Sequence, residues 1–140
     1  MLEYILNNHG YDRYPGFCHI LPNTAIMIMA MLYGENDFTN SYVEVSITNQ
    51  RVWMYVNGEC IVDTPVVTGN IGKNMGTRKG IFSLTYKTKN AVLRGADYET
   101  PVKYWMPFDG GIGLHDATWR GVFGTPYYTT NGSYGCINIP

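Results

Sequence analysis

One cysteine in the last part of the sequence stands among residues suited to catalysis rather than to a packed core. Cys136 lies in the run SYGCIN (133–138). The glycine lets the backbone turn sharply, so successive N–H groups can point at one spot, as an oxyanion hole requires. A thiolate there could attack a carbonyl group. The run therefore predicts a nucleophilic cysteine, although a free cysteine more often behaves as a small buried hydrophobic residue.

A nucleophilic thiol needs a partner, because an unperturbed thiol is mostly protonated at neutral pH. His115 is the one histidine in the sequence after residue 41. It is therefore the candidate base, or ion-pair partner, of Cys136. A lone histidine is more often structural than catalytic, but the position of this one before SYGCIN favours catalysis.

The order of these residues resembles the signature of the L,D-transpeptidase catalytic domain, the YkuD family. That signature is a histidine, then a gap about as long as the one between His115 and Ser133, and then Ser/Thr-His-Gly-Cys-hydrophobic-Asn. The similarity continues through the segments VEVSITNQRVWMYVNGECIVDTPVVTGN and YWMPFDGGIGLHDATWR, and so covers residues 42–140. Base, turn and nucleophile occur in order. The chain is identified as a member of this family.

The resemblance implies roles for individual residues. Cys136 matches the nucleophile, and His115 matches the base that activates it and later protonates the leaving group. The backbone carbonyl of Asp116 is expected to orient the histidine. The remaining signature positions are matched by Ser133, Gly135 and Asn138. The oxyanion hole is expected from three consecutive backbone N–H groups, those of Tyr134, Gly135 and Cys136.

The resemblance also implies a reaction, acyl transfer on peptidoglycan stem peptides. The thiol attacks the carbonyl of the third residue, D-Ala leaves, and an amine on a neighbouring stem resolves the thioester. No metal or cofactor is needed. Carbapenem-type β-lactams are the expected inhibitors. The expected location is the extracellular face of the cell envelope, with the export signal outside this chain.

Three features depart from the family pattern. Tyr134 stands where the signature has histidine, which removes an imidazole beside the thiol but keeps a backbone N–H. The segment TRKG (77–80) replaces Thr-Pro-x-Gly in a turn. The family domain continues past the asparagine with a helix and a strand, so we expect a C-terminally incomplete domain.

The alternative function is a catalytically impaired or fragmentary cell-wall-binding domain. A cysteine peptidase of the NlpC/P60 type is disfavoured, since its cysteine precedes its histidine.

Composition narrows the classes of function. Hydrophobic residues make up 45% and charged residues 15%, which is typical of a globular domain. The net charge of −1 gives no footprint for nucleic acid or for an anionic membrane. The apolar run AIMIMAMLY (25–33) is too short to span a bilayer and predicts a buried helix or strand. The three cysteines are widely spaced, which argues against a zinc site and leaves one Cys18–Cys60 bridge open.

The elements that must position the site are strands. The Asn57-Gly58 dipeptide between RVWMYV and ECIVDT predicts a hairpin with a type I′ turn. Further strands are predicted at YVEVSIT (42–48), GIFSLTYKT (80–88) and GGIGLH (110–115), the last ending at the histidine. A polar cluster (34–40) indicates a boundary near residue 41. We therefore expect a segment 1–41 of unknown role and a mainly β domain over 42–140. The resemblance implies that this domain is catalytic and is a YkuD-type β-sandwich with short helices.

Overall fold

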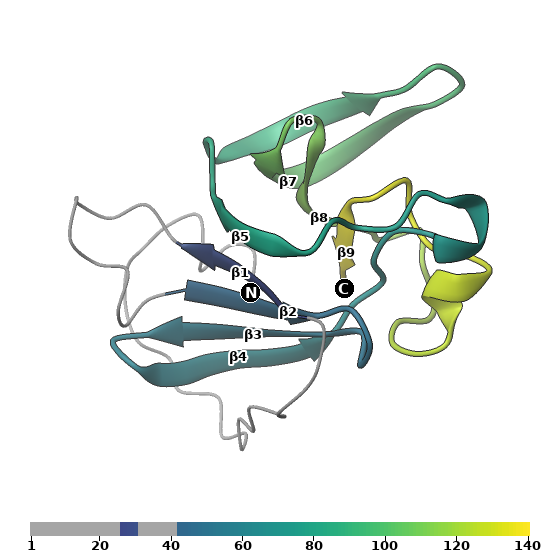
Figure 1. Cartoon of the computed structure of the whole chain (residues 1–140). Coiled ribbons are helices and arrows are strands. Elements are labelled where there is room, and N and C mark those ends of the chain that lie inside the picture. The colour runs from purple at the N-terminus through teal and green to yellow at the C-terminus, as the bar shows by residue number, and fades with distance from the viewer. Residues whose placement is uncertain (1–25, 31–41) are drawn as a thin grey trace.

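The structure, a computed structural model, describes residues 26–30 and 42–140. This part of the chain contains two β-sheets. The first sheet has the strand order β4-β3-β2-β1-β5, and the second has the order β6-β7-β8-β9 (Figure 1). The strands of the first sheet are β1 (Ile26–Ala30), β2 (Tyr42–Ser46), β3 (Arg51–Val56), β4 (Glu59–Pro65) and β5 (Gly80–Ser83). Those of the second are β6 (Thr88–Arg94), β7 (Glu99–Asp109), β8 (Ile112–Asp116) and β9 (Ile137–Ile139). Two short 3-10 segments, η1 (Ile71–Lys73) and η2 (Tyr127–Thr129), lie in connections.

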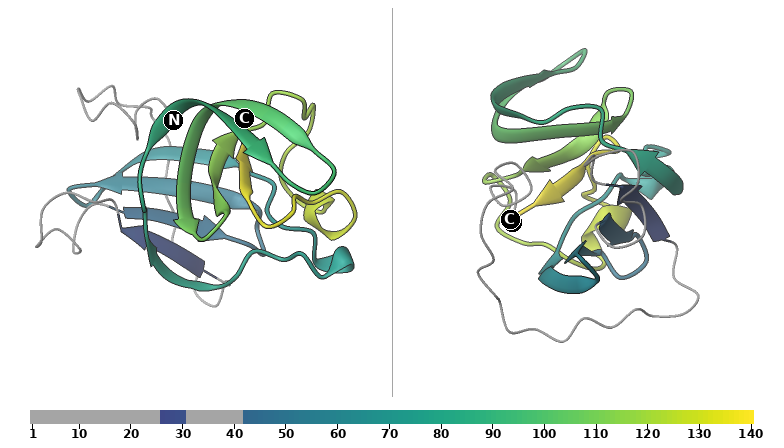
Figure 2. Two further views of the ribbon diagram at one scale, coloured as in Figure 1. Left: turned by 90° about the horizontal axis from the view of Figure 1, so that it is seen from above. Right: turned by 90° about the vertical axis from the view of Figure 1, so that its left-hand side faces the viewer.

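The hydrophobic core lies between the two sheets, which appear as separate layers in Figure 2. The first sheet contributes alternate residues of its strands, Val43, Val45, Val52, Met54 and Ile61. The second sheet contributes Tyr104, Met106, Phe108, Leu114, Ile137 and Ile139. Because successive side chains of a strand face opposite sides, this alternation is what a two-layer β structure requires. The prediction of a mainly β domain is confirmed.

The hairpin predicted at Asn57-Gly58 is present. Asn57 has a φ of 50° and Gly58 a φ of 78°, and these two positive values are what a type I′ turn needs. The turn joins β3 to β4, whose register is antiparallel. On β2, Val43 and Val45 belong to the core, but Glu44 is buried as well. The first sheet is therefore covered on both faces at this strand.

The other predicted strands differ in their extent. The strand predicted over 80–88 ends at Ser83, and Thr88 begins β6. The strand predicted at 110–115 begins at Ile112, because the two preceding glycines form the turn from β7, and it continues one residue past His115. The strands β6, β7 and β9 were not predicted. The residues of β6, TKNAVLR, are mostly polar and carry little periodic signal.

The run AIMIMAMLY forms a strand rather than a helix at Ile26–Ala30. This strand, β1, pairs antiparallel with β2 and parallel with β5. It thus lies between β2 and β5 in the first sheet. Its residues precede the boundary predicted near residue 41. The division at residue 41 stays a prediction, since residues 1–25 and 31–41 lie outside the described residues. Within the described residues, no helix is long and apolar enough to cross a bilayer.

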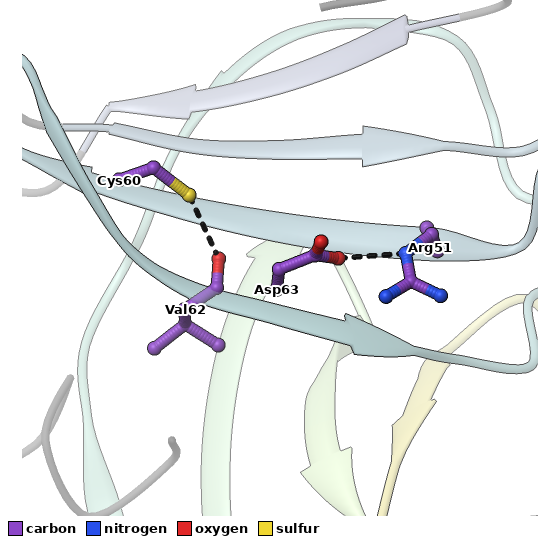
Figure 3. A network of polar contacts seen from close by, with 4 residues as sticks. All are labelled: Arg51, Cys60, Val62 and Asp63. Atoms are coloured by element: carbon purple, nitrogen blue, oxygen red, sulfur yellow. Dashed lines mark hydrogen bonds and ion pairs between the residues drawn. The ribbon is translucent and has the colours of Figure 1, made fainter. Parts of the chain in front are cut away.

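The β3–β4 hairpin contains an ion pair and the cysteine Cys60 (Figure 3). Arg51 Nε donates to Asp63 Oδ1 at 2.6 Å and so joins the two strands. Cys60 is disulfide-bonded, and its Sγ lies 3.3 Å from the carbonyl oxygen of Val62. The other cysteine of the Cys18–Cys60 bridge left open above lies outside the described residues. Within the described part of the chain, the free cysteine is Cys136.

Candidate active site

The parallel pairing of β8 with β9 brings the predicted base and nucleophile together. His115 pairs with Asn138 in the register of these strands, and Cys136 directly precedes β9. Both His115 and Cys136 line one cleft of about 300 Å³. Ser133, Tyr134 and Asn138 also line it. The sequence separated these residues into two segments, and the sheet joins them in one site.

His115 is held in a single tautomer by its neighbour. The side chain is only 4% exposed, and its Nδ1 lies 2.8 Å from the carbonyl oxygen of Asp116. A carbonyl oxygen only accepts hydrogen bonds, so Nδ1 carries the proton and Nε2 keeps its lone pair. This is the contact expected of Asp116. Burial lowers the pKa of His115, although the bond to the Asp116 backbone acts in the opposite direction.

Two tryptophans flank the imidazole. The ring of Trp119 stacks on it with centroids 5.8 Å apart at 27°, and that of Trp105 lies 6.1 Å away at 45°. Trp119 also lines the cleft and is half exposed. The rings exclude water from His115, which disfavours its charged form.

Cys136 is partly buried and lines the same cleft. Its Sγ lies 3.9 Å from the carbonyl oxygen of Gly111. Burial raises the pKa of the Cys136 thiol, while a hydrogen bond with the backbone of Gly113 acts in the opposite direction. A raised thiol pKa and a lowered imidazole pKa both favour the neutral pair. The arrangement thus suits a histidine that removes the proton as the thiol attacks, rather than a preformed thiolate–imidazolium ion pair.

Ser133 shapes the loop that precedes the thiol. Its Oγ donates to the carbonyl oxygen of Cys136 at 2.5 Å and accepts from the N–H of Gly135 at 3.0 Å. The N–H of Gly135, one of the three donors predicted for the oxyanion hole, is thus hydrogen-bonded within the loop in this conformation. The N–H groups of Tyr134 and Cys136 make no hydrogen bond to described groups. These two are the donors left for an oxyanion.

The loop is fixed to the segment that leaves β4. The N–H of Ser133 donates to the carbonyl oxygen of Thr68, and its own carbonyl accepts from the N–H of Asn70, both at 2.9 Å. Gln50 holds Thr68 in turn, accepting from its N–H at 2.8 Å and donating to its Oγ1 at 2.7 Å. Asn138 exchanges two backbone hydrogen bonds with Val67. This supporting layer was not predicted, because no local pattern links residues so far apart in the sequence.

Tyr134, the departure from the signature, meets an aromatic partner from the second sheet. Its ring stacks on that of Tyr98, with centroids 5.5 Å apart at 28°. Tyr98 lies in the turn between β6 and β7, and both rings line the cleft. Tyr134 is 55% exposed. The pair therefore forms a wall of the cleft close to Cys136, and Tyr98 was not a predicted site residue.

The charged side chains of the cleft are all cationic. Lys73 and Arg120 line it, and no Asp or Glu does so among the described residues. Arg120 donates from Nη1 to the carbonyl oxygen of Asn131 at 2.8 Å, and its buried Nε has no partner within residues 42–140. Neither cation was singled out from the sequence. In the described regions, no cluster of three His, Cys, Asp or Glu residues could hold a metal ion.

Comparison with known proteins gives the same family as the sequence motif. The L,D-transpeptidase catalytic domain model, YkuD, matches residues 40–140. A search of curated protein sequences gave no match. The chain is 38% identical to Enterococcus faecium L,D-transpeptidase, crystallised as a cysteine-to-serine mutant, over 72% of this chain and 42% of that one, with a TM-score of 0.68. The chain thus spans about two fifths of the length of that protein.

Two further structures are similar. The catalytic domain of the E. faecium enzyme acylated by ertapenem is 38% identical, with 72% of this chain and 81% of that one covered and a TM-score of 0.64. An L,D-transpeptidase from Mycobacterium smegmatis is 21% identical over 83% and 49% of the two chains, with a TM-score of 0.56, and this supports the fold alone. The YkuD-type fold is confirmed, and the chain belongs to the family of L,D-transpeptidase catalytic domains.

Proposed function

We propose that this domain forms peptidoglycan cross-links by acyl transfer through a thioester on Cys136, with release of D-Ala. The observation that carries the proposal is the pairing, in one cleft, of a free thiol with an imidazole whose Nδ1 is bound to the Asp116 carbonyl. This bond leaves Nε2 of His115 as the atom that takes the thiol proton. An extracellular location at the cell envelope follows from such a substrate and is part of the proposal.

The first half of the reaction forms the thioester. Nε2 of His115 takes the proton as Cys136 Sγ bonds to the carbonyl carbon of the third stem residue, and the carbonyl π electrons move to its oxygen. The N–H groups of Tyr134 and Cys136 are the available donors to that oxyanion. When the carbonyl re-forms, the C–N bond to D-Ala breaks and the nitrogen takes the proton from the imidazolium.

The second half of the reaction restores the thiol. An amine of a neighbouring stem attacks the thioester and gives its proton to Nε2 of His115. The new C–N bond forms, the C–S bond breaks, and the proton returns to Cys136. His115 therefore acts as base and acid in turn, which a neutral resting imidazole permits.

The cationic cleft supports an anionic donor. A tetrapeptide stem ends in the carboxylate of D-Ala, and this group leaves with the amine. Arg120 is the suitable partner, because its guanidinium has no carboxylate to pair with among the described residues. Lys73 lines the same cleft. We propose that Arg120 binds the carboxylate of the donor peptide.

Acylation by ertapenem tests the nucleophile directly, and the acylated E. faecium relative supports the choice of drug. The intact mass should rise by one drug molecule, and peptide mapping should place the adduct on Cys136. Cys136→Ala should remove the adduct, while Cys60 is disulfide-bonded and should not react. An adduct elsewhere, or none, would contradict the proposed nucleophile.

A second candidate, a wall-binding domain without turnover, is favoured by one observation. Tyr134 replaces the signature histidine and stacks on Tyr98 at the wall of the cleft. Under this alternative the domain binds a tetrapeptide stem but releases no D-Ala. Incubation with a tetrapeptide donor and an amine acceptor, followed by mass spectrometry of the product, separates the two functions.

A further inference from the structure

The side chain of Thr77 connects two backbone groups on opposite sides of the site. Its Oγ1 accepts from the N–H of Gly69 at 2.9 Å and donates to the carbonyl oxygen of Gly135 at 2.7 Å. Thr77 is only 8% exposed and does not line the cleft. Both hydrogen bonds are thus made behind the catalytic loop, away from the space that a substrate would occupy.

The bond to Gly135 sets the direction of the next N–H. A trans peptide is planar, so the carbonyl of Gly135 and the N–H of Cys136 point in opposite directions. With the carbonyl turned toward Thr77, the N–H of Cys136 points away from it. That N–H is one of the two oxyanion donors left without a partner, and Cys136 itself lines the cleft.

The peptide needs such an anchor because its conformation is an unusual one. Gly135 has a φ of +117°, which side-chain-bearing residues rarely adopt. A glycine at this position could rotate freely unless other groups fixed it. Ser133 holds the N–H of Gly135, and Thr77 holds its carbonyl. The Thr77 hydroxyl is in turn held by Gly69, whose neighbours leave no room for a side chain, since a Cβ there would lie 2.1 Å from the Met75 carbonyl oxygen.

We infer that Thr77 is a positioning residue, whose hydroxyl aims the N–H of Cys136 at the oxyanion formed during acyl transfer. The inference rests on the proposed role of Cys136 as nucleophile, but not on peptidoglycan as the substrate. The threonine itself, rather than the altered residues that follow it in TRKG, is then what this turn contributes to the chemistry.

Two electrophilic reagents, both attacked by the Cys136 sulfur, separate this role from a merely structural one. With p-nitrophenyl acetate, the Cys136 sulfur bonds to the ester carbonyl carbon as Nε2 of His115 takes the thiol proton, charge moves to the carbonyl oxygen, and nitrophenolate leaves as the carbonyl re-forms. With iodoacetamide, sulfur displaces iodide and no oxyanion forms. A loss of oxyanion positioning should therefore slow only the first reaction.

The test compares Thr77→Val, which has nearly the same shape but no hydroxyl, with Thr77→Ser, which keeps the hydroxyl. The rates of acetylation and alkylation of Cys136 are both followed by peptide mass spectrometry. The temperature is kept below the thermal unfolding midpoint of each variant. In Thr77→Val, acetylation should fall by up to the roughly 10²- to 10³-fold that loss of one oxyanion donor costs, while alkylation keeps its rate. Thr77→Ser should restore the ratio of the two rates.

The inference would be overturned if Thr77→Val had the same ratio of acetylation rate to alkylation rate as the unmutated protein. An equal fall in both rates would leave this ratio unchanged and would overturn it too. Should Thr77→Val not fold, Thr77→Cys takes its place, since a buried thiol is a weak hydrogen-bonding group and should lower the same ratio. Neither reagent resembles a stem peptide. The result therefore stands whether or not ertapenem acylates the protein, and the two proposals can fail separately.

Discussion

Replacing His115 by alanine should slow acylation by ertapenem at pH 7 by at least about 10²-fold, within the 10²- to 10⁴-fold range of a lost general base. The lower bound follows from the thiol. At its ordinary pKa of 9.0, a thiol is about 1% ionised at pH 7, and burial raises the pKa of Cys136 above that value. Without a base, only this small thiolate fraction can react.

The same reasoning predicts how the defect changes with pH. In the unmutated protein, the rate should be level from a pH below 6.5 upward, because burial lowers the pKa of His115 from that ordinary value. In His115→Ala, the rate should rise about tenfold per pH unit, because the thiolate fraction does so below the thiol pKa. The difference between the two proteins should therefore shrink by roughly 100-fold from pH 7 to pH 9.

The assay is the time course of the intact-mass shift at fixed ertapenem concentration over this pH range. His115→Asn is the matched control, because its side-chain N–H can still donate to the Asp116 carbonyl while offering no base. It should behave as His115→Ala does. A defect of the same size at every pH would refute the general-base reasoning. So would a level rate in His115→Ala, which would mean that the thiol is already ionised at neutral pH.

Three further results are expected. Tyr134→His should raise the ertapenem acylation rate without changing the fold, as monitored by circular dichroism; an unchanged rate would mean that Tyr134 contributes mainly its backbone N–H. Arg120→Gln should raise KM for a tetrapeptide donor with a free C-terminal carboxylate but not for its C-terminal amide, and an equal change for both would rule out a carboxylate contact. Gln50→Met should lower the free energy of unfolding by about 3 kcal/mol in urea titrations, since it removes three buried side-chain hydrogen bonds worth about 1 kcal/mol each; a change within error would show that the bonds to Thr68 are replaced.

Short-range signals predicted the parts of the fold that depend on neighbouring residues. Asn57-Gly58 supplies the two positive φ angles of the β3–β4 turn from the residues of the turn themselves. The run YVEVSIT indicated the strand β2. The β6–β7 hairpin carried no comparable signal on its first strand, because β6 is mostly polar and has no buried residue.

The candidate site shows the same division. Cys136 and His115 were proposed as nucleophile and base from their residue types and order, and the structure places both at one cleft. Tyr98 and Thr77 were not predicted at the site, since each meets the catalytic loop only after segments distant in the sequence have packed together. Arg120 lies close to His115 in the sequence but was not singled out from it. The sequence also left the Cys18–Cys60 bridge open, and the disulfide-bonded state of Cys60 shows which of the described thiols is free.

The sequence by itself determined the family, the mainly β fold and the identity of the two groups proposed to react. Only the tertiary structure decided which backbone N–H groups remain for an oxyanion, because Ser133 takes that of Gly135 and Thr77 orients the next peptide. It also decided that the thiol and the imidazole favour their neutral forms, because that balance depends on burial by residues from other strands. Hydrogen bonds and desolvation between distant segments exist only once the sheets are packed, and no local pattern encodes them.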